Sequence, residues 1–260
     1  MIEALTDQPA VLFFVLTLVL SLVALFGSYT LAARYAPERA ARDENAFGLG
    51  QTAIFGLIVL ILAFSFSFAA ERFEARRALV VEEADGVAAA YDHMDYLPPA
   101  RRDIERDLVR KYTDARIRAL ADVSYTWEDG PNAQAANGYY KRLWDMATTD
   151  VRADRHNVAY LALAEEIDKA GDIAEYQVAA VNNHIPPPIL GIVVLCTLVG
   201  AALLGLTFGR VASPNPALSI IFCVLFAATV FTIVDMDHPK GGLLQIDVAP
   251  LNNALHDMKR

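Results

Sequence analysis

The stretch that decides the fold is residues 51–94, QTAIFGLIVLILAFSFSFAAERFEARRALVVEEADGVAAAYDHM. Its first part, residues 52–70, contains no charged residue. At about 1.5 Å per helical residue, this part matches a hydrocarbon core roughly 30 Å thick. The second part is rich in charge but contains no proline that would end a helix. The stretch therefore predicts a single helix that leaves the membrane and continues in water.

The charged part of this helix carries an apolar stripe. Its members recur at helical spacing: Phe73, Val80, Ala84, Val87, Tyr91 and Met94. Such a stripe is typical of a helix that buries one face against other helices and exposes the opposite face to water. We therefore expect the second half of the helix to belong to a soluble helical layer.

Composition places the chain in a membrane. Of its 260 residues 55% are hydrophobic, the mean hydropathy is +0.32, and the apolar residues lie in blocks. The formal net charge of −9 argues against a nucleic-acid partner, because no basic run offers contacts to phosphates. Cys196 and Cys223 lie inside apolar blocks, which favours packing over a disulfide or a metal site.

Four segments have the length of a membrane span: residues 11–33, 52–70, 189–208 and 217–234. We expect an all-α integral membrane protein with four transmembrane helices, in which span two continues into a helical bundle. The expected divisions are 1–70 with spans one and two, 71–184 as the bundle, 185–236 with spans three and four, and 237–260 as a tail. The first span is expected to be retained, because no basic start precedes it as in a signal peptide.

The insert between spans two and three is predicted to be a small antiparallel helical bundle. Leu97-Pro98-Pro99 ends the long helix and begins the next. That next helix has an apolar stripe of Ile104, Leu108, Tyr112, Ala115 and Ala119. Its opposite face carries Arg101, Arg102, Glu105, Arg106 and Arg110. Two more amphipathic stretches follow, around residues 140–147 and 167–181.

Basic residues beside the spans predict the orientation. No basic residue precedes span one, whereas Arg34, Arg39 and Arg42 follow it, which favours a cytoplasmic first loop. Three arginines after span two oppose this assignment: Arg72, Arg76 and Arg77. Long inserts translocate largely regardless of charge, so the first loop decides. We expect a multi-pass protein of the cell membrane with its bundle on the extracytoplasmic side.

No enzymatic signature is found. The chain lacks His-Glu-x-x-His, Gly-x-Ser-x-Gly, phosphate-loop and Cys-x-x-Cys motifs. A membrane-embedded hydrolase remains a remote alternative that lacks a nucleophile–base pair. The histidines show no metal-ligand spacing: His93, His156, His184, His238 and His256. We therefore expect a protein that is not an enzyme, with no catalytic residue, no metal and no cofactor.

One face of span two is a candidate ion path. Small and polar residues fall in one narrow sector of the helix: Thr52, Gly56, Ala63, Ser67, Ala70 and Glu74. Two interpretations remain open, because small residues also let helices pack closely. If the face is a water-filled path, Phe64 and Phe68 beside it form a hydrophobic constriction that gates by dewetting.

Charged residues gather where span two leaves the membrane. This girdle consists of Arg72, Glu74, Arg76, Arg77, Glu82, Glu83 and Asp85. Such a run is commonly a solvated helix face with i,i+4 pairs, and an ion vestibule is the alternative. At the end of span four, Asp235 and Asp237 are boundary residues or partners for the arginines after span two. By themselves they are too few for a calcium shell.

The order of these features resembles the bacterial bestrophin-like domain family, whose function is uncharacterised. The matching pieces are Asp43-Glu44-Asn45 with Gly48, residues 73–84, Leu97-Pro98-Pro99, and Tyr112. The end of the chain looks like the family's closing motif, with Asp235, Asp237, Pro239 and Gly241, then Pro250-Leu251 and Ala254-Leu255.

The resemblance implies four spans and a helical insert. More remotely, it implies kinship with bestrophins, which are homo-oligomeric anion channels whose second span lines the pore; no calcium clasp is carried over. The expected function is an oligomeric ion channel in membrane lipid that passes small inorganic ions, anions more readily than cations. The alternative is a non-enzymatic membrane sensor or scaffold whose insert binds a ligand or partner protein through Tyr139, Tyr140 and Trp144.

Overall fold

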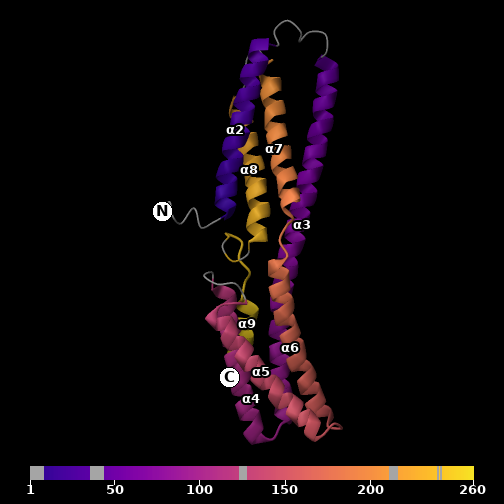
Figure 1. Cartoon of the computed structure of the whole chain (residues 1–260), viewed down its shortest axis with the longest axis vertical. Helices are drawn as coiled ribbons and strands as arrows, with labels where there is room; N and C mark the ends of the chain where they lie inside the picture. The colour runs from indigo at the N-terminus through magenta and orange to yellow at the C-terminus, as the bar shows by residue number, and fades with distance from the viewer. Residues whose placement is uncertain (1–8, 36–43, 123–127, 211–215, 239, 241) are drawn as a thin grey trace. The chain divides into compact units, whose positions relative to one another are not determined.

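The computed structural model describes residues 9–35, 44–122, 128–210, 216–238, 240 and 242–260. Over these residues the regular elements are all helical, which confirms the predicted class. Figure 1 labels the helices. They are α2 (Pro9–Tyr35), α3 (Glu44–His93), η1 (Met94–Tyr96), α4 (Pro99–Ala121), α5 (Pro131–Ala153), α6 (Val158–Asn182), α7 (Pro187–Phe208), α8 (Pro216–Asp237) and α9 (Ala249–Asp257).

Four of these helices contain segments long and apolar enough to cross a membrane: Ala10–Arg34, Gly48–Tyr96, Pro187–Phe208 and Ala217–Asp237. They contain the four predicted spans, and the chain is a multi-pass membrane protein. Helix α3 is a single helix of 50 residues, as the sequence of residues 51–94 predicted. No proline interrupts it, and its backbone hydrogen bonds are satisfied within the helix, as lipid requires.

The chain forms two compact units. The membrane unit consists of Met1–Phe73 and His184–Leu244, and the bundle unit of Glu74–Asn183 and Gln245–Arg260. Helix α3 contributes its first part to the membrane unit and its second part to the bundle unit. The predicted tail, residues 237–260, belongs to both units. Its residues up to Leu244 are part of the membrane unit, and Gln245–Arg260 are part of the bundle unit.

In the membrane unit, α2 packs along α7 and α8, and Figure 1 shows α2 and α7 side by side. Gly205 of α7 allows this approach, because a Cβ atom there would collide with the Leu25 carbonyl and the Ser28 side chain of α2. Helix α3 joins the same unit through one stripe. Its Ile58, Leu62 and Ala69 lie in a buried cluster with residues of α7 and α8.

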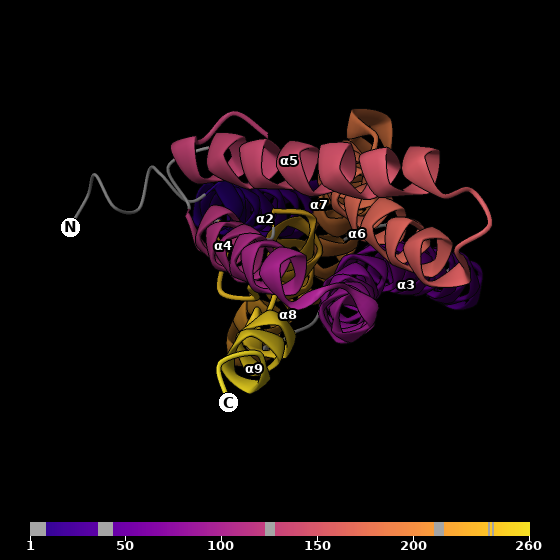
Figure 2. The ribbon, with the colours of Figure 1, turned by 90° about the horizontal axis from the view of Figure 1, so that it is seen from below.

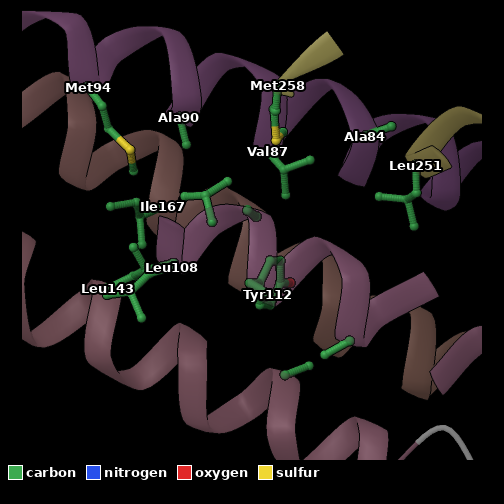
Figure 3. Close-up of a cluster of buried hydrophobic side chains, with 14 of the residues drawn as sticks. Ala84, Val87, Ala90, Met94, Leu108, Tyr112, Leu143, Ile167, Leu251 and Met258 are labelled. Atoms are coloured by element: carbon green, nitrogen blue, oxygen red, sulfur yellow. The ribbon is translucent and has the colours of Figure 1, made fainter. Parts of the chain in front are cut away.

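In the bundle unit, α3, α4, α5 and α6 enclose a continuous apolar core. The predicted stripe of α3 is confirmed at its centre, since Val80, Ala84, Val87 and Met94 are buried. Figure 3 shows Leu108, Leu143 and Ile167, from three helices, pointing toward one another. Figure 2, seen from below, shows α4 and α6 on the same side of α5. Leu251 of α9 (Ala249–Asp257) and Met258, which follows this helix, complete the core.

The predicted face of α4 is wrong at one edge. Ile104 is 52% exposed, whereas its neighbour Glu105 is fully buried. The carboxylate is tolerated there because Arg101 bonds to it at 3.0 Å and also reaches Asp150 at 2.8 Å. Burial outweighs Arg101, and the pKa of Glu105 is raised. A pattern of apolar residues cannot reveal such a site, because Arg101, which pairs with Glu105 on the same helix, is itself bound by Asp150 of α5.

The core of the bundle unit contains a buried ion pair. Arg116 of α4 donates from Nε to Glu83 Oε1 of α3 at 2.7 Å and from Nη2 to Glu83 Oε2 at 3.2 Å. The Tyr112 hydroxyl donates to Glu83 at 3.0 Å. Gln177 of α6 donates to Glu83 at 2.9 Å and accepts from Arg116 at 2.6 Å. One network therefore ties three helices together.

Each member of the network has a hydrogen-bond partner within it. Burial alone would lower the pKa of Arg116, but the negative charge of Glu83 and their hydrogen bond hold it above the ordinary value. Burial, followed by the charge of Glu83, raises the pKa of Tyr112 well above its usual range, so Tyr112 remains a neutral donor. Gln177 also donates to the Leu79 carbonyl at 3.0 Å, so both ends of its amide have partners.

Replacing one member of the pair should therefore destabilise the bundle. We expect Arg116→Met to cost about 3–5 kcal/mol, because it leaves the Glu83 carboxylate buried without its counter-ion. The measurement is the Tm of purified protein in detergent. Arg118→Met is the matched control, since Arg118 lies on the same helix in an exposed pair with Asp114, worth at most about 1 kcal/mol.

A double variant separates lost charge pairing from lost packing. Glu83→Met/Arg116→Met should recover part of the Tm lost in Arg116→Met, because neither charge is then left alone. Equal Tm values for Arg116→Met and Arg118→Met would contradict this account of the core.

Candidate functional site

The residues predicted to line a path lie on the surface of the membrane unit. Thr52, Gly56, Ala63 and Ser67 are all exposed. A Cβ atom added at Gly56 would meet nothing within 4 Å. Within the described chain, Gly205 and Gly209 make close small-residue contacts with α2, whereas this sector of α3 is left uncovered.

The exposed sector stands nearly opposite the buried stripe of the same helix. The stripe consists of Ile58, Leu62, Ser65 and Ala69. At about 100° per residue, its centre lies roughly 140° around the helix from the centre of the small-residue sector. The stripe packs α3 against the other helices of the membrane unit. The small-residue sector is not covered by any described residue of the chain. Thr52 donates to the Gly48 carbonyl at 2.9 Å, so its hydroxyl is satisfied without leaving the helix.

Phe64 and Phe68 are 56% and 55% exposed and, at about 100° per residue, lie roughly 90° and 130° around the helix from the centre of this sector. They lie one turn apart, so their rings occupy successive levels of one side of α3. Phe66, which is 40% exposed, lies on the other side of the sector, roughly 70° from its centre by the same projection. Phe64 and Phe68 thus form a pair on one side of α3, and Phe66 lies nearer the centre of the sector than either of them.

The charged girdle is divided into buried and exposed members. Arg76 is 1% exposed, and it donates from Nε to the Ala180 carbonyl at 3.0 Å and from Nη2 to the Asn183 carbonyl at 3.2 Å. These carbonyls end α6, where a positive charge is favoured by the helix dipole. Glu83 is buried in the network with Arg116. Both residues therefore hold the bundle together.

The remaining members of the girdle lie toward solvent. Arg77 pairs with Glu74 at 2.8 Å, with both side chains at least half exposed. Glu82 and Asp85 are exposed, and Arg72 is half-buried. An exposed i,i+3 pair of this kind contributes little to stability. Its charges remain accessible to ions in the surrounding water.

The bundle unit contains a pocket of about 470 Å³ beside the buried network. Its lining includes Tyr112, Arg116, Glu128, Asn137, Tyr140 and Glu175. Tyr140 lies directly over Gly171, where a Cβ atom would collide with the phenol ring. Burial raises the pKa of Tyr140, and the negative charges of Asp168, Asp172 and Glu175 add to this. Tyr139 and Trp144 pack against the core, as Tyr140 also does, but they do not line the pocket.

The closing segment is organised by two buried carboxylates. Asp235 accepts from the backbone N–H groups of Leu243 at 2.9 Å and Leu244 at 2.8 Å, and a Cβ atom at Gly242 would collide with it. Asp237 accepts from the Ile185 N–H at 3.1 Å. Pro239 and Gly241 of the predicted motif, and Asp43 of the earlier one, lie outside the described residues.

The sequence placed Glu83 in the charged girdle and Tyr112 in the apolar stripe of α4, but it did not predict that they share one network with Arg116 and Gln177. The residues are 33 and 94 positions from Glu83. The available signal was weak: a glutamine and an arginine each interrupt the apolar face of a helix. Such an interruption indicates a buried polar partner without saying which one.

Comparison with known proteins gives a consistent result. A bacterial bestrophin homologue from Klebsiella pneumoniae matches at a TM-score of 0.66 and 14% identity, over 95% of this chain and 97% of that one. Another structure of that homologue matches at 0.61 and 17%, over 96% of each chain. A structure described as a membrane protein matches at 0.64 and 15%, over 96% of each. At these identities the likeness shows the fold alone.

No curated protein matches the chain. The model of the Bestrophin-like domain matches residues 20–251, which is most of the sequence. The motifs of the sequence, four candidate spans and the fold of the bacterial homologues agree with this match. The chain belongs to the Bestrophin-like domain family.

Proposed function

We propose that this protein is a subunit of a homo-oligomeric ion channel in which α3 lines the pore. The observation that carries the proposal is the uncovered sector of α3, with Thr52, Gly56, Ala63 and Ser67 exposed nearly opposite the buried stripe. Cyclic symmetry repeats one face of one helix around an axis. A ring of small and polar residues then encloses water, and the rest of α3 stays packed within each subunit.

The fold supports this proposal by analogy. The solved relatives are described as bacterial bestrophin homologues, and the chain shares their fold over nearly its full length. Fold does not fix function, so the argument rests on the character of the α3 surface. A helix face of small residues facing lipid gains nothing from its shape, whereas the same face gains close packing or hydration in an assembly.

Phe64 and Phe68 form the gate in this proposal. Repeated around an axis, two successive levels of exposed phenyl rings give a narrow apolar constriction. Water leaves such a constriction when it is narrow enough, and ions cannot follow without their hydration shell. Thr52, Gly56, Ala63 and Ser67 provide a wider lining beside it.

Anion preference rests on the arginines at the end of the span. Arg72, Arg76 and Arg77 lie within two turns of α3, and their positive charges raise the local anion concentration. Arg76 is buried against α6, so it contributes through its field and not through contact. Glu74 pairs with Arg77 and reduces its effect. The resulting preference is for anions over cations, without strict selection.

Removing the phenyl rings should open the path. In liposomes containing the purified protein, we expect Phe64→Ala/Phe68→Ala to raise chloride flux severalfold over wild type, because the constriction is wetted more easily. Phe26→Ala is the matched control, because Phe26 is a 47% exposed phenylalanine of α2, and it should leave the flux at the wild-type level. If neither wild type nor the double variant passes ions, or if Phe26→Ala has the same effect, the pore assignment is wrong.

A second function is favoured by the pocket of the bundle unit. Its volume of about 470 Å³ lies within the range of small-molecule sites. Two tyrosines line it, together with Glu128 and Glu175. Arg116 faces the pocket but is neutralised by Glu83. Aromatic rings with acidic neighbours favour an organic cation as a ligand, and the protein would then be a membrane sensor.

Tetramethylammonium is a suitable probe for this pocket. We expect it to raise the Tm of the purified protein in a concentration-dependent manner, as ligand binding to the folded state must. Glu175→Gln should weaken the shift by removing a lining charge without changing size. Glu165→Gln, on the same helix but outside the lining, should not. No shift in the wild type, or equal shifts in both variants, would argue against a cation site.

The bundle is proposed to lie outside the cytoplasm, from the basic residues that follow span one. Asp103 of α4 is exposed and suits labelling. In intact cells, a cysteine introduced as Asp103→Cys should react with a membrane-impermeant thiol reagent, while one introduced as Arg39→Cys should react only after lysis. The reverse pattern would place the bundle in the cytoplasm.

A further inference from the structure

Three potential metal ligands meet at the end of α8. His184 lies just before α7, and Asp237 and His238 follow one another where α8 ends. Each offers one nitrogen or oxygen atom, and these atoms all lie within 4.8 Å of one another. The sequence showed no metal-ligand spacing because His184 and Asp237 are 53 residues apart. All three residues belong to the membrane unit.

The two imidazoles and the carboxylate are in direct contact. His184 Nδ1 lies 3.2 Å from Asp237 Oδ2. The rings of His184 and His238 are stacked, with centroids 5.3 Å apart and an interplanar angle of 25°. In a tetrahedral site with bonds of about 2.0–2.1 Å, neighbouring ligand atoms lie roughly 3.3–3.4 Å apart. The separation of 3.2 Å between His184 Nδ1 and Asp237 Oδ2 is close to this value.

His238 is held in an orientation suited to a ligand. Its Nδ1 lies 3.0 Å from the Val234 carbonyl oxygen. A carbonyl only accepts, so Nδ1 must carry the proton. In the neutral ring, the lone pair is then on Nε2. Metal-binding histidines usually donate their second N–H in this way, which fixes the tautomer and the ring plane.

Asp237 is held equally firmly. Its side chain is buried, and the Ile185 N–H bonds to it at 3.1 Å from Oδ1 and 3.2 Å from Oδ2. Each carboxylate oxygen has two lone pairs, so this hydrogen bond and a metal bond are compatible. The side chain of His184 is 51% exposed and has room to turn. The site therefore has two fixed ligands and one adjustable ligand at its solvent edge.

We propose that His184, Asp237 and His238 bind a divalent transition-metal ion of the zinc class. Two imidazoles and one carboxylate are the ligands that Zn²⁺ takes in proteins, whereas Ca²⁺ and Mg²⁺ prefer oxygen alone. Three protein ligands leave a fourth position for water. The ion links the residue before α7 to the end of α8 and so fixes the ends of spans three and four against each other.

The proposal differs from a hydrogen-bonded cap in what it requires of His184. If Asp237 only caps the chain by accepting from the Ile185 N–H, the exposed imidazole of His184 contributes little to stability. As a metal site, His184 supplies one of three bonds, and its loss removes a full ligand. Because loss of an outer-shell partner alone costs 10–100-fold in metal affinity, loss of a direct ligand is expected to cost at least about 100-fold.

The test is calorimetric titration of the full-length protein, purified in detergent without a polyhistidine tag and treated with chelator. We expect one Zn²⁺ per subunit in the wild type, and no comparable heat from Ca²⁺ or Mg²⁺. His184→Gln and His238→Gln should each weaken Zn²⁺ binding at least about 100-fold. His156→Gln is the matched control, because His156 is exposed and belongs to the bundle unit.

A second measurement distinguishes the loss of a metal ligand from misfolding of the variant. The Tm of His184→Gln without metal should equal that of wild type, and Zn²⁺ should raise the Tm of wild type and of His156→Gln but not that of His184→Gln. Bound Co²⁺ should give the intense visible absorption of a tetrahedral site, lost in both ligand variants and kept in His156→Gln. The proposal is overturned if wild type binds no Zn²⁺, if Ca²⁺ binds more tightly, or if His184→Gln binds Zn²⁺ as well as His156→Gln.

Discussion

The structure depends on α3 remaining one helix through two different environments. In the hydrocarbon core an unpaired backbone group costs several kcal/mol, so the segment has no alternative to a helix there. Beyond the core, the helix is kept by the packing of Val80, Ala84 and Val87 against the bundle. The buried stripe therefore has to follow the same helix in both units, first with Ile58 and Leu62 and then with Val80 and Val87. Any break in the helix would separate these two sets of contacts.

The buried charges of the bundle define the register in which its helices pack more clearly than they increase the free energy of unfolding. An apolar core can pack in several registers, but Glu83 is satisfied only where Arg116, Tyr112 and Gln177 all reach it. Such networks cost desolvation and are compensated only when every partner is present. Arg76 acts similarly at the edge of the bundle, where it accounts for two terminal carbonyls of α6. The charged run after span two is thus partly internal structure.

In the membrane unit, α7 packs closely against α2, whereas one face of α3 stays exposed. The tight approach involves Gly205 of α7 against Leu25 and Ser28 of α2. The small residues of α3, including Gly56 and Ala63, stay uncovered within the subunit. This division leaves both interpretations of the α3 sector open, because a face that no described helix of the same chain covers is accessible to lipid, to water or to another protein surface.

The sequence alone determined the helical class, the four spans and the continuity of α3, because each depends on local features: uncharged length, helical spacing and the absence of proline. It also determined the central stripe of α3, with Val80 and Met94. Only the tertiary structure decided that Glu105 is buried while Ile104 is exposed, that Glu83 pairs with Arg116, and that His184 meets Asp237 and His238. These facts depend on partners 33 to 53 residues away or on another helix, and a helical pattern gives the period of a face without naming the residue that opposes it.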